Sequence, residues 1–278
     1  MMKRLLFFCH IMLVFVVFAS CDDNDSFTTN PSSILSFSKD TVSMDTVFST
    51  VPTSTYTFWV YNHNDDGLRL SQVRLARGNQ SGFRVNVDGT YLDNTMGSLV
   101  RDLEVRGGDS IRVFVELTSS LTNSSDPQLV EDNLVFTLES GTEQRVNLRA
   151  YSWDALLCRN VMISRDTTIA SSKPVVVYGG LTVDSGATLT VTAPTKLYFH
   201  SDAGIDVYGR LVISGSAGND VVLRGDRTDR MFDYLPYDRV SGQWQGIRFR
   251  PSSTGNTIAY ADIHSATDGI VCDSAAYD

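Results

Sequence analysis

The stretch that decides the fold covers residues 175–223 and reads VVVYGGLTVDSGATLTVTAPTKLYFHSDAGIDVYGRLVISGSAGNDVVL. Its apolar residues come in alternating pairs that recur, as when Leu181 and Val183 return 24 residues later as Ile205 and Val207. Short alternating strands that recur about every 20–25 residues, without a helical period, are typical of a solenoid. Since Gly and Ser separate the strands, we predict a β-helix with one coil per repeat.

Three further pairs extend this pattern along the chain. They are Leu189 and Val191 with Leu211 and Ile213, Leu197 and Phe199 with Val221 and Leu223, and Ile247 and Phe249 with Ile270 and Cys272. The last pair places Cys272 at an inward position, which predicts a buried free thiol. The period is interrupted at residues 224–243, which we predict to be an inserted loop. Insertions leave a solenoid as loops on one face and are common places for binding.

Residues 34–150 carry shorter alternating segments separated by turns, of which residues 56–61 (YTFWVY) are the clearest. Seven or eight strands of this kind predict a β-sandwich. Between the two patterns, residues 151–174 are expected to form a transition. Apolar side chains of this segment, among them Leu156 and Leu157, would cover the first coil, because an exposed solenoid end presents unpaired strand edges.

Both parts resemble known families. Residues 58–62 (FWVYN), 108–113 (GDSIRV) and 132–136 (DNLVF) resemble the Ig-like domains of the ASH type, over most of residues 34–150. Residues 180–183 with 186–189, and 204–207 with 209–211, resemble the right-handed parallel β-helix repeats of Bacteroidetes surface lipoproteins, over roughly residues 160–278. The resemblances imply an all-β chain, with an Ig-like β-sandwich at 34–150 and a right-handed parallel β-helix, a solenoid, at 175–278.

The N-terminus has the form of a targeting segment. Lys3 and Arg4 precede an apolar run at residues 5–18, which is short for a membrane span and suits a signal peptide. Residues 18–21 (FASC) resemble the lipobox of bacterial lipoproteins, with Phe18 where that family usually has Leu. The resemblance implies that residues 1–20 are removed and that Cys21 carries the lipid. Ordinary secretory cleavage near Ala19 is the alternative.

The acidic residues 22–25 (DDND) follow directly and resemble the surface-export signal of Bacteroidetes lipoproteins. They imply an outer-membrane protein that is exposed at the cell surface, with residues 21–33 as a polar tether. The net charge of -9 and the pI near 4.9 argue against nucleic acid as a partner. Cys158 and Cys272 would lie about four coils, or roughly 19 Å, apart at the spacing of paired strands, too far for a disulfide.

The inserted loop and its flank concentrate aromatic and charged side chains. The expected ligand-binding set is Phe232, Tyr234, Tyr237 and Trp244, with Arg227, Arg230 and Arg239. Aromatic faces beside guanidinium groups and carboxylates can stack on sugar rings and bind their hydroxyls, so the expected partner is a polysaccharide or host glycan. In the alternative, the aromatic side chains hold the loop against the solenoid and the charges pair locally.

Catalytic chemistry on a β-helix requires paired acids, or a calcium site with a basic residue, on adjacent outward strands. The candidates are Asp202, Asp206 and Asp226 with Arg248 and Arg250. Nothing in the sequence shows that they converge, and the histidines lack metal-ligand spacing. We therefore expect no metal, no cofactor and a non-catalytic role in adhesion, glycan binding or scaffolding. The alternatives are a β-helix polysaccharide lyase or glycoside hydrolase, and a fragment truncated at Asp278 without activity of its own.

Overall fold

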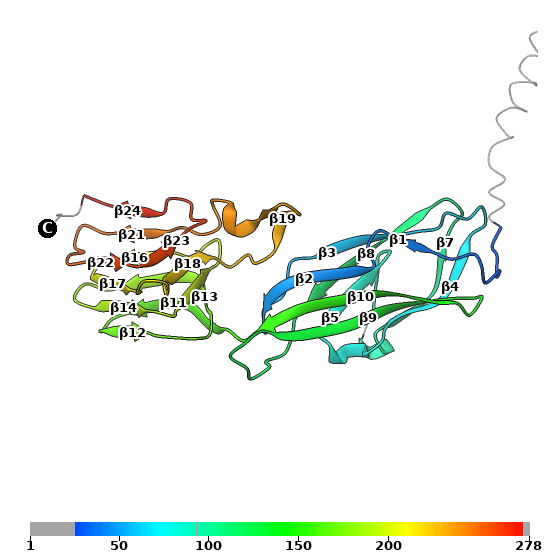
Figure 1. The fold of residues 1–278 in the computed structure, drawn as a ribbon, viewed down its shortest axis with the longest axis horizontal. Helices are drawn as coiled ribbons and strands as arrows, with labels where there is room; N and C mark the ends of the chain where they lie inside the picture. The colour runs from blue at the N-terminus through cyan, green and yellow to red at the C-terminus, as the bar shows by residue number, and fades with distance from the viewer. Residues whose placement is uncertain (1–25, 93, 275–278) are drawn as a thin grey trace, which may run out of the picture.

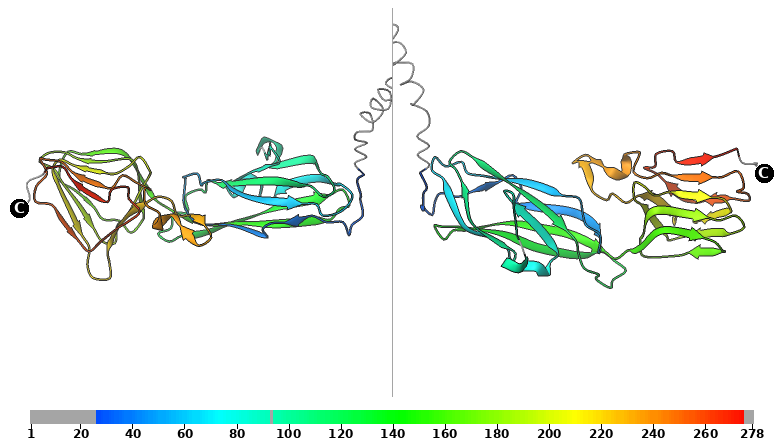
Figure 2. Two further views of the ribbon diagram at one scale, coloured as in Figure 1. Left: turned by 90° about the horizontal axis from the view of Figure 1, so that it is seen from above. Right: turned by 180° about the vertical axis from the view of Figure 1, so that it is seen from behind.

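The computed structural model describes residues 26–92 and 94–274, and these residues form 24 strands and three short 3-10 helices (Figure 1). The prediction of an all-β chain is therefore confirmed. The predicted signal peptide, Cys21 and the acidic segment lie outside the described residues. Figures 1 and 2 show two bodies arranged end to end, which we call the N-terminal body (β1–β10) and the C-terminal body (β11–β24). The 3-10 helices are η1 (Gly78–Gln80), η2 (Asn94–Met96) and η3 (Tyr237–Arg239).

The N-terminal body consists of two five-stranded sheets that share one apolar core. The first sheet has the order β1 (Ser36–Phe37), β3 (Tyr56–Tyr61), β8 (Ser110–Leu117), β5 (Phe83–Val87) and β6 (Thr90–Tyr91). The second has the order β2 (Thr41–Phe48), β10 (Glu143–Trp153), β9 (Gln128–Leu138), β4 (Leu68–Leu75) and β7 (Leu99–Val105).

Alternation along the strands builds this core. In β3, Phe58 and Val60 are buried while Trp59 between them is exposed, because successive side chains of a strand point to opposite faces. Antiparallel pairing with β8 sets Phe58 opposite Val113. One face of each sheet thus supplies the core and the other meets solvent.

Strand β7 has no counterpart among the sequence predictions. It lies at the edge of its sheet and carries Arg101, Asp102 and Glu104, which are exposed. Asp102 also has a positive φ of 56°, which bends the strand. An edge strand of this kind needs no continuous apolar face, so the alternation that reveals other strands is weak here.

The C-terminal body consists of three stacks of strands, and all neighbours within a stack pair in parallel. Two of the stacks share the bent strands β11 (Leu156–Ile163) and β13 (Val175–Val183). From β13, the first stack continues through β15 (Lys196–Phe199), β18 (Val221–Gly225) and β23 (Ala261–Ile263). The second continues through β16 (Ile205–Val207), β21 (Ile247–Phe249) and β24 (Ile270–Cys272). The third contains β12 (Thr167–Ile169), β14 (Thr188–Thr192), β17 (Arg210–Ser214) and β22 (Thr257–Ala259). Figure 2 shows these strands around a common interior, which their apolar side chains fill.

The bend in β13 takes the chain from one stack to the next at Gly179 and Gly180. Both have positive φ, 66° and 93°, a conformation that side chains disfavour. A Cβ at Gly179 would also collide with the side chain of Asn160. Glycine is therefore the residue that suits this corner of the chain.

The repeat predicts the pairing in three of its four cases. Leu181 pairs with Ile205, Leu189 with Leu211, and Ile247 with Ile270, as expected. The fourth prediction is wrong by two residues, since Leu197 pairs with Leu223 and Phe199 with Gly225. The physical reason is the space at Gly225, the partner of Phe199, where a Cβ would collide with the side chain of Gln243, so glycine fits at this position.

One prediction at the ends of the stacks is wrong. Cys272 has the expected register opposite Phe249, yet it is exposed, because no strand among the described residues pairs with the other edge of β24.

The expected cover at the other end holds only in part. Strand β11 pairs in parallel with the edge of β13, and its Ile163 is buried in the core. The side chains of Leu156 and Leu157, by contrast, are exposed and cover nothing.

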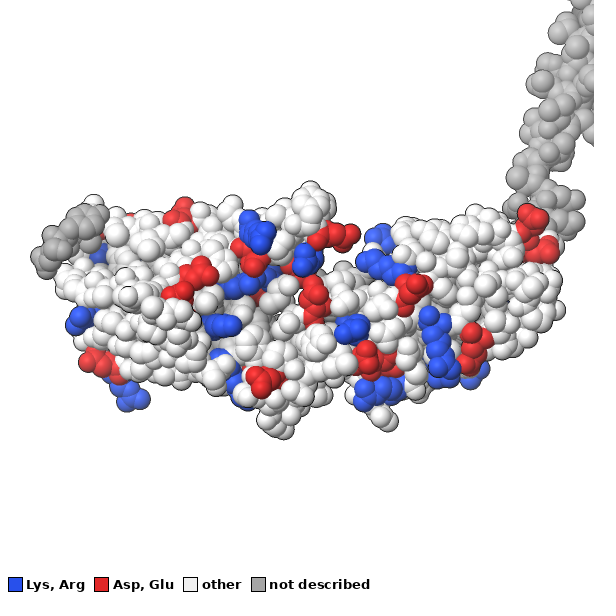
Figure 3. Space-filling model, in the orientation of Figure 1, with Lys and Arg blue, Asp and Glu red and all other residues white. Residues whose placement is uncertain are grey.

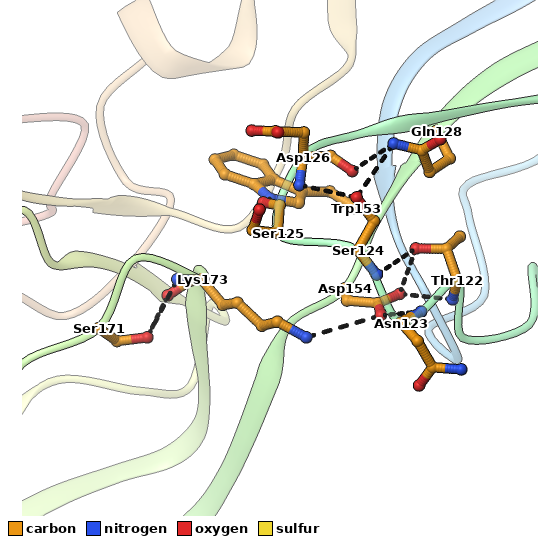
Figure 4. Close-up of polar contacts among 10 residues, drawn as sticks. All are labelled: Thr122, Asn123, Ser124, Ser125, Asp126, Gln128, Trp153, Asp154, Ser171 and Lys173. Carbon is orange, nitrogen blue, oxygen red and sulfur yellow. Dashed lines mark hydrogen bonds and ion pairs between the residues drawn. The ribbon is translucent and has the colours of Figure 1, made fainter.

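Polar contacts anchor the junction between the two bodies (Figure 4). The buried carboxylate of Asp154, which follows β10, accepts hydrogen bonds from the backbone N–H groups of Thr122 (2.9 Å) and Asn123 (2.8 Å). The ammonium group of Lys173, from the C-terminal body, lies 3.7 Å from the same carboxylate. An apolar cluster of Phe48, Val176 and Tyr198 joins the bodies beside this network.

Candidate functional site

The predicted insertion contains a hairpin of β19 (Arg230–Phe232) and β20 (Leu235–Pro236), followed by η3. Figure 1 shows it projecting toward the N-terminal body. The aromatic side chains at its tip are strongly exposed, 54% for Phe232 and 79% for Tyr234. Their rings stack with 5.6 Å between centroids and 11° between planes. The structure thus brings two of the predicted ligand-binding residues together as one open aromatic surface.

Trp244 does not belong to this surface, and its prediction as a ligand-binding residue is wrong. Its side chain is fully buried, its ring stacks on Phe199, and its indole N–H donates a 2.8 Å hydrogen bond to the carbonyl of His264. A large aromatic ring with a satisfied N–H is a core residue. Burial is decided by the strands that surround Trp244, which the local sequence does not reveal.

The arginines of the insertion are paired to different degrees. Arg227 makes two 2.6 Å hydrogen bonds to the carboxylate of Asp229, which raise its pKa, and lies 3.8 Å from the ring centroid of Tyr237. Arg230 lies 3.8 Å from Asp45 of the N-terminal body, so the hairpin also bridges the junction. Arg239 is exposed at the rim of an open hollow beside the hairpin. Figure 3 shows basic and acidic side chains intermixed in this region, in agreement with local pairing.

A cleft with a volume of about 430 Å³ lies where the insertion meets the N-terminal body. The side supplied by the N-terminal body is largely apolar and includes Met44, Val47 and Phe48. The side supplied by the C-terminal body is formed by Tyr178, His200 and residues 226–229. The hydroxyl of Thr228, which lines the cleft, donates a 2.6 Å hydrogen bond to the carbonyl of Thr46.

A histidine and an aspartate meet in this cleft. Nδ1 of His200 lies 2.9 Å from the carboxylate of Asp226, whose side chain is only 13% exposed. Burial raises the pKa of Asp226, although the contact with His200 opposes this effect. The sequence prediction treated the two residues separately. They are 26 residues apart, which is the offset between Leu197 and Leu223, so the correct register places them side by side at the ends of the paired strands β15 and β18.

The candidates for catalysis do not assemble into a pair of acids. Asp206 lies 2.6 Å from Arg250, and Asp273 accepts from both Arg250 (3.2 Å) and Arg248 (3.1 Å). These residues form one row of ion pairs across β16, β21 and the end of β24. Such neutralised carboxylates suit neither a proton donor nor a nucleophile.

The third acid considered for catalysis, Asp202, accepts a hydrogen bond from the N–H of Gly179 at 3.3 Å. Within residues 26–92 and 94–274, no group of three or more His, Cys, Asp and Glu side chains is placed to hold a metal ion. The described part of the chain also contains no helix long and apolar enough to cross a membrane.

No protein-family model and no curated protein matches this chain. Among solved structures, a protein of unknown function from Porphyromonas gingivalis W83 is similar over 42% of this chain and 46% of its own length, at 13% identity and a TM-score of 0.32. The PapD-like domain 7 (ASH/PapD-like) of human CEP192 is similar over 46% of this chain and 91% of that domain, at 12% identity and a TM-score of 0.28. The chain thus spans less than half of the Porphyromonas protein, and similarities at this level carry no conclusion about function.

Proposed function

We propose that the protein is a lipid-anchored, surface-exposed protein of the bacterial outer membrane with a non-catalytic, glycan-binding role. In this proposal the N-terminal body is an Ig-like sandwich that serves as a stalk. The C-terminal body is a short right-handed parallel β-helix displayed beyond it. Three parallel stacks whose strands follow one another along the chain support this assignment, and parallel crossover connections are right-handed in nearly all proteins. A solenoid offers a long rigid face that suits extended ligands.

The proposed lipid anchor can be tested by measuring the intact mass of the native protein. We expect native protein extracted from the outer membrane with detergent to begin at Cys21 and to carry acyl groups. The variant Cys21→Ser should leave the membrane fraction, because the attached acyl chains supply the membrane affinity. A native chain that begins near Ala19 and carries no lipid would contradict the anchor and leave ordinary secretion.

The stacked pair of Phe232 and Tyr234 is the observation that carries the proposed binding role. Large aromatic rings are normally buried or partly covered, so two rings exposed on a hairpin tip point to an interaction surface. Their open face can take the apolar face of a sugar ring. The neighbouring Arg230 and Asp233 supply groups that bind hydroxyls.

The double substitution F232A/Y234A tests this role on a panel of bacterial and host glycans. We expect binding to weaken by about 10-fold or more, since each stacked ring contributes roughly 0.5–1.5 kcal/mol beyond its buried area. The melting temperature should change little, because both side chains are exposed. Tyr91→Ala removes an exposed tyrosine from the N-terminal body and serves as the matched control. Equal binding by the double variant and the wild type would exclude the hairpin as the glycan site.

A further inference from the structure

The cleft between the two bodies contains a polar pair, an exposed histidine in contact with a largely buried aspartate, that the proposed hairpin site does not use. We infer that this cleft is a second binding site, separate from the hairpin tip, which takes one neutral sugar residue or a disaccharide. The inference shares its ligand class with the proposed function and rests on it to that extent. It is carried by the shape of the cleft, the paired state of its arginine and its polar groups.

The shape suits a small ring with one apolar face. The volume of about 430 Å³ lies toward the lower end of the range for small-molecule sites, roughly 300–1,000 Å³. Met44, Val47 and Phe48 offer an apolar surface on one side, and polar groups stand on the other. Because the sides come from both bodies, a bound ligand would contact the sandwich and the strand stacks together.

The charges that line the cleft disfavour an anion. Arg227 makes two hydrogen bonds to Asp229, so its charge is already paired. The carboxylate of Asp226 lies in the same cleft, in contact with Nδ1 of His200. An anionic ligand would therefore lose its hydration without gaining an unpaired positive charge. The cleft favours a polar, uncharged ligand over an anionic one.

The polar groups suit hydroxyls, which both donate and accept hydrogen bonds. The carboxylate of Asp226 is an acceptor. The contact with Asp226 involves Nδ1 of His200, so Nε2 is the ring nitrogen that a ligand would meet. The phenol of Tyr178, whose ring centroid lies 5.0 Å from that of His200, and the phenol of Tyr56 complete the set. Burial raises the pKa of both phenols, so both keep their proton and can donate.

The chain provides a matched control for the pair. His264 and Asp262 also meet at 2.9 Å through Nδ1, but on an exposed flank outside the cleft. We would measure binding to the full chain by titration calorimetry, with galactose, glucose, N-acetylglucosamine, lactose and cellobiose as neutral probes and galacturonate as a charged probe. Asp226→Asn and Asp262→Asn would be compared with the wild type. Tyr178→Phe removes a single hydroxyl and guards against a folding defect in Asp226→Asn.

We expect at least one neutral probe to bind the wild type. Asp226→Asn should weaken it by about 10-fold or more, since a hydrogen bond to a charged group contributes roughly 1.5–3 kcal/mol. Tyr178→Phe should weaken it by a smaller factor, and Asp262→Asn should leave it unchanged. Galacturonate should bind more weakly than galactose. The inference is overturned if no neutral probe binds, if Asp262→Asn weakens binding as much as Asp226→Asn, or if galacturonate binds more tightly than galactose.

Failure of this inference can be distinguished from failure of the proposed function. Glycan-panel binding that depends on Phe232 and Tyr234, without any calorimetric binding of neutral probes, would overturn the cleft site and leave the hairpin site. Neutral-sugar binding that depends on Asp226, without any effect of F232A/Y234A on the panel, supports the cleft and removes the hairpin.

Discussion

Replacing Trp244 by alanine will destabilise the C-terminal body by about 3–5 kcal/mol, the usual cost of removing a large buried aromatic side chain. The indole is fully buried and stacked on Phe199, so its loss leaves a cavity in the middle of the strand stacks. The substitution also removes the indole N–H that donates to the backbone carbonyl of His264, so this carbonyl loses a hydrogen bond. Chemical denaturation followed by circular dichroism gives the free energy of unfolding directly.

Trp59→Ala is the matched control for Trp244→Ala. Trp59 is a tryptophan of the N-terminal body that is 40% exposed on β3. Its replacement should cost about 1 kcal/mol or less, since little buried area is lost. An equal loss in the two variants, or an unchanged stability in Trp244→Ala, would contradict the assignment of Trp244 to the core. It would also reopen a role for Trp244 in ligand binding.

Replacing Asp154 by alanine will loosen the junction between the two bodies, at a cost of about 2–5 kcal/mol. The carboxylate is buried and accepts hydrogen bonds from two backbone N–H groups, those of Thr122 and Asn123 (Figure 4). Without the carboxylate these donors lose their partner, and Lys173 loses its counterion. Asp126→Ala, in the same loop but exposed, should change the unfolding free energy by less than about 0.5 kcal/mol. Comparable losses in both variants would contradict the anchoring role of Asp154.

The effect of Asp154 should depend on pH. Burial alone would raise the pKa of this carboxyl group, but the hydrogen bonds from Thr122 and Asn123 outweigh burial and place the pKa below its ordinary value. A pKa that is lower in the folded state than in the unfolded state stabilises the fold above the ordinary value of about 4. This stabilisation is lost as the pH falls through the folded pKa. The difference in unfolding free energy between wild type and Asp154→Ala should therefore shrink below about pH 4, whereas a constant difference would show that the charge plays no part.

The limits of sequence-based prediction are clearest at the aromatic residues. Phe232, Tyr234 and Trp244 occur within a short stretch of similar composition, and the sequence predicted one role for all three. The hairpin exposes Phe232 and Tyr234. Trp244 lies where the chain re-enters the C-terminal body, and its ring stacks on Phe199. The contact between His200 and Asp226 was missed for a related reason. The predicted register of β15 and β18 was two residues too short, which would have placed Arg224 beside His200.

The sequence alone determined the all-β class and three of the four strand pairings that the repeat predicts. Alternation with period two and repeats of 22–24 residues are local or regular properties, and they follow from the geometry of the strand itself. Tertiary structure decided which aromatic side chains in and beside the insertion are buried, where the edge strand β7 lies, and which charged side chains form ion pairs. These features depend on contacts between residues far apart in the chain, such as Thr228 with Thr46 or Lys173 with Asp154, and no local pattern encodes them. The interdomain cleft belongs to this second group, because it exists only where the two bodies meet.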